Sequence, residues 1–398
     1  MSAPTGASNA PAAAHTAAEA LSLLDALARA PAAAALVIAA LERADRKALR
    51  LAHPQLRNAV GEATTKLKVL SPVPARPPTV YSAVPARPPT PRRWPRLEEL
   101  TFSRGPDAAA FEALRSGTWR SLHTLRLGDF GGHSPALGAP AARALAAAAP
   151  RMPALRALVL YRMKICDAAA AELFRAASAV APLQLRALTL VAAELPLAAA
   201  RALAATGWRL EELDLFESTV GAASLAALVA APTFAIRRLG LRSCGMDAAA
   251  LLSLASAPWP LEELDLSCND LRAAAVGPAL EALSRHTRLR LRWLNIDLCS
   301  LSAAGFKALV EATWPALNHL SARAAQVALE GPDALGAAAF ADFPALEELH
   351  LSLVELGEAG ARPLASRRWP HLRVLSLHHA LLGDAGLAAF VRGEFPAL

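Results

Sequence analysis

The sequence is poor in cysteine, in aromatic residues and in charge, and it lacks a long hydrophobic run. Four cysteines among 398 residues are too few for a disulfide-stabilised fold, and 19% charged residues are too few for a charged disordered chain. The apolar run at 32–41 is far shorter than the roughly 20 residues that span a bilayer. The first 20 residues contain no Lys or Arg, so we expect no secretory signal. These absences predict a soluble cytoplasmic protein, with a nuclear or a ciliary and cytoskeletal location as alternatives.

The chain also lacks clustered charge and the motifs of common enzymes. Its net charge of +7 comes from arginines spread along the chain among pairs of glutamates, without a run of five like charges. We therefore expect neither nucleic acid nor a membrane as a partner. No nucleophile elbow, zinc-protease motif, Walker A loop or dinucleotide-binding glycine pattern occurs. The sequence predicts no catalytic residue, no cofactor and no metal site.

A repeated phrase dominates the chain from residue 94 onward. Eleven copies begin 25 to 33 residues apart, at residues 97, 122, 155, 185, 210, 236, 261, 291, 317, 346 and 372. A fixed phrase at this period is typical of a solenoid. Residues 395–398 open a twelfth phrase, so we expect either a truncated array or an exposed last strand edge.

The phrase resembles the leucine-rich repeat. Numbering its positions from the first leucine, the copy that begins at Leu261 carries leucine at positions 1, 4, 6 and 11 and asparagine at position 9. Cys244 and Cys299 occupy position 9 of their own copies, where we expect buried thiols. The resemblance covers about three quarters of the chain. The period and the helical segments are similar to the ribonuclease-inhibitor-like subclass.

The physical pattern agrees with the resemblance. Leucines at positions 4 and 6 alternate with polar residues, which predicts a half-buried strand. The segments 221–231, 302–314 and 383–395 are rich in alanine with apolar residues at helical spacing, which predicts helices. We therefore predict an α/β solenoid shaped as a horseshoe, with parallel strands on the concave face and helices on the convex face.

An aromatic residue marks the return from each predicted helix to the next strand. It is usually followed by proline, as in Trp94-Pro95, Trp259-Pro260, Trp314-Pro315, Phe343-Pro344, Trp369-Pro370 and Phe395-Pro396. Proline ends the helix, and we expect the aromatic ring to fill the corner under the next strand. These rings are predicted to be structural.

Strand alternation predicts which residues face the concave side, because positions 3, 5 and 7 point away from the leucine core. Aromatic and arginine side chains among them are of the types that dominate protein interfaces. The candidate partner-binding residues are Tyr161, Glu212, Asp214, Phe216, Arg238, Arg242, Glu263, Asp265, Trp293, Asp297, Arg323, His350 and His378. His350 and His378 lie on neighbouring predicted strands. They are either metal ligands or, as we expect, exposed histidines of the binding surface.

The chain before the repeats divides into three parts. Residues 1–16 are predicted to be a disordered tail, and residues 17–70 have helical patterns. Residues 71–93 contain VPARPPT twice, which predicts a semi-rigid polyproline linker before the repeats at 94–398.

The helical segment at 17–70 resembles an F-box. The resemblance rests on the phrase from residue 36 to residue 60, with Asp45 and the pair Leu49-Arg50. It implies contacts with a Skp-type adaptor of a cullin ubiquitin ligase through Leu36, Val37, Ile38, Leu41, Leu49 and Leu56. The other interpretation of this segment is a helical cap on the first repeat.

Two functions follow from these patterns. The first is a non-enzymatic scaffold or adaptor that binds a protein partner on its concave face. The second is the substrate receptor of a cullin ubiquitin ligase, and it depends wholly on the F-box resemblance.

Overall fold

The computed structural model shows how the repeats stack. It describes residues 66–69, 97–102, 108–128, 136–137, 139–161, 164–165, 171–175, 184–285, 290–324, 340–341 and 343–398. Among these residues, no helix combines the length and the hydropathy needed to cross a membrane.

Twelve strands form one parallel sheet in which each strand lies beside its predecessor in the chain. Position 3 of each repeat pairs with position 3 of the next, as Glu263 does with Trp293. All eleven repeated phrases contribute a strand. The strands are β1 (Lys66–Val69), β2 (Glu99–Phe102), β3 (Thr124–Gly128), β5 (Ala157–Tyr161), β7 (Ala187–Val191), β8 (Glu212–Asp214), β9 (Arg238–Gly240), β10 (Glu263–Asp265), β11 (Trp293–Asn295), β12 (His319–Ser321), β13 (Glu348–His350) and β14 (Val374–Ser376).

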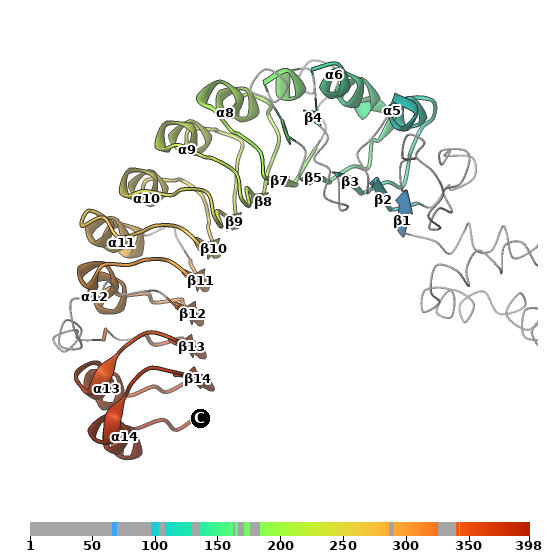
Figure 1. Ribbon diagram of the computed structural model, residues 1–398. Helices are drawn as coiled ribbons and strands as arrows, with labels where there is room; N and C mark the ends of the chain where they lie inside the picture. The colour runs from blue at the N-terminus through green and yellow to red at the C-terminus, as the bar shows by residue number, and fades with distance from the viewer. Residues whose placement is uncertain are drawn as a thin grey trace, which may run out of the picture.

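Helices line the outside of an arc whose inside is the sheet (Figure 1). They are α5 (Ala108–Arg115), α6 (Ala139–Ala148), the 3₁₀ turn η1 (Ala149–Arg151), α8 (Leu197–Ala204), α9 (Ala222–Val229), α10 (Ala248–Ala255), α11 (Val276–Arg285), α12 (Ala303–Glu311), α13 (Gly357–Ser366) and α14 (Gly383–Arg392). A separate pair of short parallel strands, β4 (Ala136–Leu137) and β6 (Lys164–Ile165), lies between sheet and helices on the same arc (Figure 1). The helices predicted at 221–231, 302–314 and 383–395 are confirmed as α9, α12 and α14.

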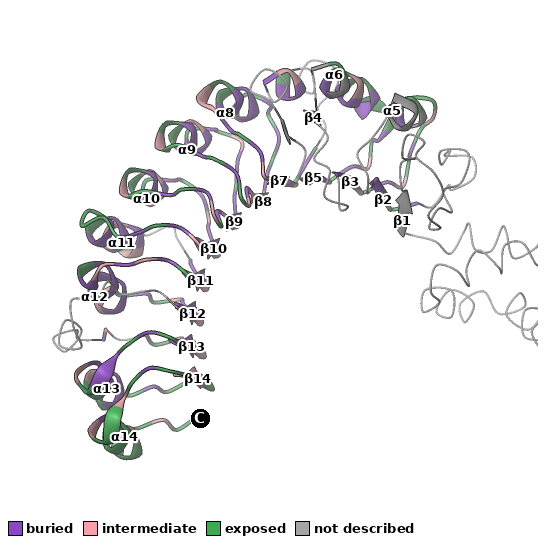
Figure 2. Ribbon diagram, in the orientation of Figure 1, coloured by how far each residue is buried: buried purple, intermediate pink, exposed green. Residues whose placement is uncertain are grey.

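The core lies between the sheet and the helices. From β2 to β13 the residues at positions 4 and 6 are buried, and Leu264 and Leu266 are both fully covered. The helices from α8 to α13 have buried residues on one side and exposed residues on the other, whereas α14 at the end of the array is mostly exposed (Figure 2). This arrangement is the α/β leucine-rich-repeat solenoid that the sequence predicted.

Small residues bring neighbouring helices close together. Buried alanines recur in the helices, including Ala199, Ala250, Ala279, Ala308 and Ala361. A Cβ added to Gly386 in α14 would lie 2.9 Å from the Cβ of Ala361 in α13, so only glycine allows this approach. Strands of a sheet lie about 4.8 Å apart, whereas packed helices lie about 8–10 Å apart. The sheet must therefore curve with its strands inside.

A left-handed residue follows each strand from β7 to β14. Position 8 has positive φ in every repeat from β7 to β14, although none of these residues is glycine: Ala192, Glu217, Ser243, Cys268, Leu298, Ala324, Leu353 and His379. In the repeats from β7 to β13 the position 8 amide donates to the carbonyl oxygen of position 7 in the next repeat. The Leu298 amide, for example, donates to the Arg323 oxygen at 2.8 Å. The inter-repeat hydrogen bond offsets the cost of the left-handed backbone.

Position 9 joins neighbouring repeats inside the core. The buried Asn269 amide nitrogen donates to the oxygens of Leu241 and Leu266, at 2.8 and 2.7 Å. Its Oδ1 accepts from the backbone amides of Cys244 and Met246, both at 3.0 Å. One side chain therefore satisfies four backbone groups of two repeats.

The thiols of Cys244 and Cys299 take the same position and are buried, as predicted. They donate to the carbonyl oxygens of Leu215 and Leu266, at 2.8 and 3.1 Å. Burial raises the pKa of both thiols to about 12. They are structural donors at neutral pH, because the thiolate form is suppressed.

The described tryptophans at the corners between helix and strand are buried, as predicted, but they differ in hydrogen bonding. Trp94 lies outside the described residues. The indole nitrogens of Trp119, Trp314 and Trp369 donate to a carbonyl oxygen at the end of the preceding helix, five residues back, at 3.1, 3.0 and 2.9 Å. The equally buried indole nitrogens of Trp208 and Trp259 have no such partner. The ring fills the corner in either case.

This difference predicts unequal effects of the same substitution. We expect Trp314→Phe to destabilise the protein by about 1–3 kcal/mol more than Trp259→Phe, because only the first leaves a buried carbonyl oxygen, that of Leu309, without its donor. Both substitutions remove the same volume, so each is the control for the other. Chemical denaturation followed by circular dichroism measures the difference. Equal losses would show that the indole hydrogen bond contributes nothing.

The sheet begins earlier than predicted. Residues 17–70 were expected to be helical and the repeats to start at 94, but Lys66–Val69 is a strand that pairs in parallel with β2. Lys66 lies opposite Glu99, and the lysine–leucine alternation suits a strand. The helical prediction is therefore wrong at 66–69. Its remaining residues lie outside the described part of the chain, as do the predicted tail and linker.

Candidate binding face

We define the candidate binding face as positions 3, 5 and 7 of the repeats that contain β8 to β14. All predicted partner-binding residues from Glu212 to His378 belong to it. Strands β8 to β14 line the inside of the arc (Figure 1). Tyr161 is the last residue of β5 and stands apart, because β7 separates it from this face. The six predicted adaptor-binding residues between 36 and 56 lie outside the described residues.

At β8 and β9 the charged groups are already paired within the face. Arg238 forms an ion pair with Glu212 on the neighbouring strand. The guanidinium carbon of Arg242 lies 5.2 Å from the centroid of the Phe216 ring, which is a cation–π contact. Phe216 is half-buried and Arg242 is exposed, so this stacked pair presents a fixed arginine to the concave space.

Two aspartates flank a glycine at position 5 of three successive strands. Asp214 Oδ1 accepts from the Phe216 amide at 3.2 Å, and Asp265 Oδ1 accepts from the Ser267 amide at 2.9 Å. A Cβ on Gly240 would lie 2.5 Å from Asp214 Oδ1, so glycine is required for the carboxylate to lie there. Burial, followed by the charge of Asp265, raises the pKa of Asp214, and the Phe216 amide opposes that shift.

Asp297 connects the repeats of β11 and β12 through hydrogen bonds. Its Oδ1 accepts from the Ser321 hydroxyl at 2.6 Å and from the Arg323 amide at 2.7 Å. Its own amide donates to Asn295 Oδ1 at 2.9 Å. Asp297 therefore organises the face, whereas Glu263 at the start of β10 is exposed.

A cluster of histidines lies at β12 and β13, beside Trp293. The ring of His319 stacks on Trp293 with centroids 5.5 Å apart and an angle of 17° between the planes. His319 Nδ1 lies 3.0 Å from Glu348 Oε2, and His350 Nε2 lies 3.4 Å from the same oxygen. Arg323 Nη2 lies 2.9 Å from His350 Nδ1. We call His319, Glu348 and His350 the histidine cluster.

His350 and His378 come from neighbouring strands, as predicted, but they do not lie opposite each other. In the β13–β14 register His350 lies opposite Ser376, and His378 follows the end of β14 as an exposed residue. His350 is only 8% exposed, so it is not an exposed binding histidine either. Its neighbours are His319 and Glu348, which the candidate residues omitted. Their shared position 3 on adjacent strands was the available signal.

Hydrogen bonding and burial set the charges in the histidine cluster. Burial lowers the pKa of His319, and the hydrogen bond to Glu348 opposes this shift. The hydrogen bond from His350 is the largest cause of a lowered pKa at Glu348. At neutral pH the face therefore presents an ionised carboxylate between histidine rings.

The face is acidic although the whole chain is basic. It carries six carboxylates, from Glu212, Asp214, Glu263, Asp265, Asp297 and Glu348. It carries three arginines, Arg238, Arg242 and Arg323. The excess of negative charge contrasts with the net charge of +7 for the whole chain.

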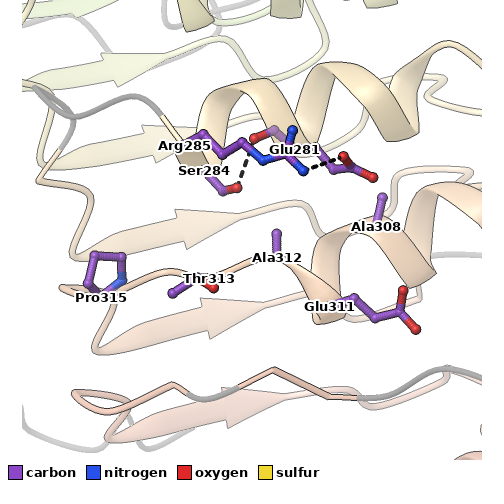
Figure 3. A pocket seen from close by; sticks show the side chains of 8 residues that line it. All are labelled: Glu281, Ser284, Arg285, Ala308, Glu311, Ala312, Thr313 and Pro315. Carbon is purple, nitrogen blue, oxygen red and sulfur yellow. Dashed lines mark hydrogen bonds and ion pairs between the residues drawn. The ribbon is translucent and has the colours of Figure 1, made fainter.

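A hollow of about 450 Å³ lies on the other side of the molecule, between the ends of α11 and α12 (Figure 3). Its Arg285 pairs with Glu281, and its Ser284 hydroxyl donates to the Glu281 carbonyl oxygen at 2.9 Å. These bonds lie within one helix. The hollow does not bring together a nucleophile and a base.

No protein-family model matches the chain, and no curated protein is similar to it in sequence. Among solved structures it is similar to an internalin (InlF) from Listeria monocytogenes, with 18% identity, 85% of this chain and 87% of that chain covered, and a TM-score of 0.43. It is also similar to a chain of the Toll–Spätzle complex of Drosophila, with 16% identity, 72% of this chain and 35% of that chain covered, and a TM-score of 0.33. The fold assignment rests on the repeats and on the sheet described above.

Proposed function

We propose that this chain is a non-enzymatic scaffold or adaptor that binds a protein partner on the candidate binding face. The observation that carries the proposal is that one continuous sheet combines an excess of carboxylates with two stacked side chains, Trp293 and Arg242. Carboxylates in excess favour a cationic segment, because complementary charge both attracts and orients a partner. The partner class is therefore a protein with a Lys- or Arg-rich segment.

We call the stacked side chains of Trp293 and Arg242 the anchor. Trp293 and Arg242 belong to the residue types that contribute most to protein interfaces. Each already has its neighbour in place, His319 for Trp293 and Phe216 for Arg242. Side chains held in this way lose little conformational freedom on binding, so more of the contact energy remains as affinity.

The anchor can be removed without touching the core. We expect the double substitution Trp293→Ala and Arg242→Ala to reduce partner capture by roughly tenfold or more. Immobilised full-length chain is exposed to a cell lysate, and the retained proteins are quantified by mass spectrometry at low and high salt. The matched control is Glu281→Ala with Arg285→Ala, a charged pair on the convex side.

The proposal requires proteins that are retained by the wild type and the control, lost by the anchor variant and released by salt. Identical retention by all three chains would contradict it. A large drop in the melting temperature of the anchor variant would show that these residues belong to the core and not to the face.

The finer assignments are also proposals. We assign the repeats to the ribonuclease-inhibitor-like subclass, and helices of 8 to 10 residues on the convex side support this. The ubiquitin-ligase receptor is the alternative function, supported by the F-box-like phrase around Asp45 and Leu49. The same capture experiment separates the two, because only a ligase receptor retains a Skp-type adaptor and a cullin after loss of the anchor.

A further inference from the structure

The histidine cluster brings three ligand atoms together on two adjacent strands. One ligand atom of each of His319, Glu348 and His350 lies within 4.8 Å of the other two, and no other group of this kind occurs among the described residues. His319 and Glu348 are paired in the sheet register, and His350 follows Glu348 by two residues on the same face. The positions of all three are therefore held by the sheet.

The distances suit a small tetrahedral ion. Zinc binds imidazole nitrogen and carboxylate oxygen at about 2.0–2.2 Å, so two ligand atoms of a tetrahedral site lie roughly 3.4 Å apart. The two nitrogens lie 3.0 and 3.4 Å from the carboxylate oxygen. Both nitrogen–oxygen distances are therefore close to the ligand–ligand distance of a zinc site.

The proton positions can be deduced from the partners. Arginine only donates, so its contact makes His350 Nδ1 an acceptor and leaves the ring proton on Nε2, facing Glu348. The carboxylate only accepts, so His319 Nδ1 also carries a proton toward it. A metal ion would occupy the place of these two hydrogens. Each proton would move to the opposite nitrogen of its ring, without net proton release.

Arg323 opposes this exchange. Once the proton is on His350 Nδ1, that nitrogen no longer accepts from Arg323, and the guanidinium charge also repels a cation. Arg323 is exposed, so its side chain has room to turn toward solvent. Metal and Arg323 therefore compete for His350.

We propose that His319, Glu348 and His350 form a zinc-binding site on the concave face, with Arg323 as its competing cation. Two imidazoles and one carboxylate match the preference of zinc, and three protein ligands leave a fourth position for water. The proposal is independent of the protein-binding function above.

Cobalt(II) is the probe, because it replaces zinc and its visible absorption reports four-coordinate geometry. Metal-free full-length protein is titrated with cobalt and then with zinc, which is expected to displace it at one equivalent. We expect His319→Gln to weaken binding by roughly tenfold or more, since a ligand is lost. We expect Arg323→Gln to strengthen it by roughly tenfold, since a nearby charge is removed.

The matched control is His378→Gln, an exposed histidine outside the cluster, which is expected to bind as the wild type does. A cobalt–thiolate band would assign the metal to cysteine and overturn the proposal. Equal binding by wild type and His319→Gln would also overturn it. The proposal would also be overturned if neither the wild type nor Arg323→Gln bound cobalt at millimolar concentration. This test does not require the histidine variants to fold.

Discussion

We expect Asn269→Ala to lower the free energy of unfolding by about 3–5 kcal/mol. The side chain is 3% exposed and satisfies two amides and two carbonyl oxygens of the backbone. Alanine leaves these four groups without partners in a place that water does not reach, and each buried unsatisfied group costs about 1–3 kcal/mol. Chemical denaturation followed by circular dichroism measures the loss.

The neighbouring Asp270 is the control for this substitution. Its carboxylate forms an exposed ion pair with Arg272. Exposed pairs contribute little, so we expect Asp270→Ala to leave the unfolding midpoint unchanged. A small loss for Asn269→Ala, similar to that of the control, would mean that the position 9 amide does not join the repeats.

The second large effect is expected from a leucine of the core. Leu264 at position 4 is completely buried, so Leu264→Ala removes apolar contacts and leaves a cavity between sheet and helix. We expect a loss of about 2–5 kcal/mol. The same denaturation experiment measures it.

Leu252 in α10 is the matched control, because 47% of it is exposed. Leu252→Ala removes the same atoms from a surface position, and alanine is a good helix former, so we expect almost no change. If both leucine substitutions had equal effects, the repeat register that places position 4 inside would be wrong.

The repeat phrase predicts most of the fold because it contains two periods, the alternation of residues along each strand and the recurrence of the phrase along the chain. Alternation at positions 4 and 6 defines the buried side of each strand, and the same phrase repeated eleven times defines the neighbours. Once Leu264 is inside, Glu263 and Asp265 must face the concave space. For that reason the residues at positions 3, 5 and 7 of the candidate binding face were predictable one by one.

Other features depend on contacts between repeats and were not predictable from one phrase. Position 8 is left-handed from β7 to β14 whatever its side chain, and from β7 to β13 its amide donates to a carbonyl oxygen of the next repeat. The requirement for Gly240 arises from the Asp214 carboxylate of another repeat. The strand at Lys66–Val69 lacks the phrase altogether, and pairing with β2 alone makes it part of the sheet.

The many alanines between the helices have a geometric consequence for the diameter of the horseshoe. If sheet and helices lie about 10 Å apart and strands repeat at about 4.8 Å, a helix spacing of about 10 Å gives an inner radius of about 9 Å. A spacing of about 8 Å, which small residues such as Ala361 and Gly386 permit, widens that radius to about 15 Å. Alanine content on the convex side thus determines how wide an object fits the opposite side.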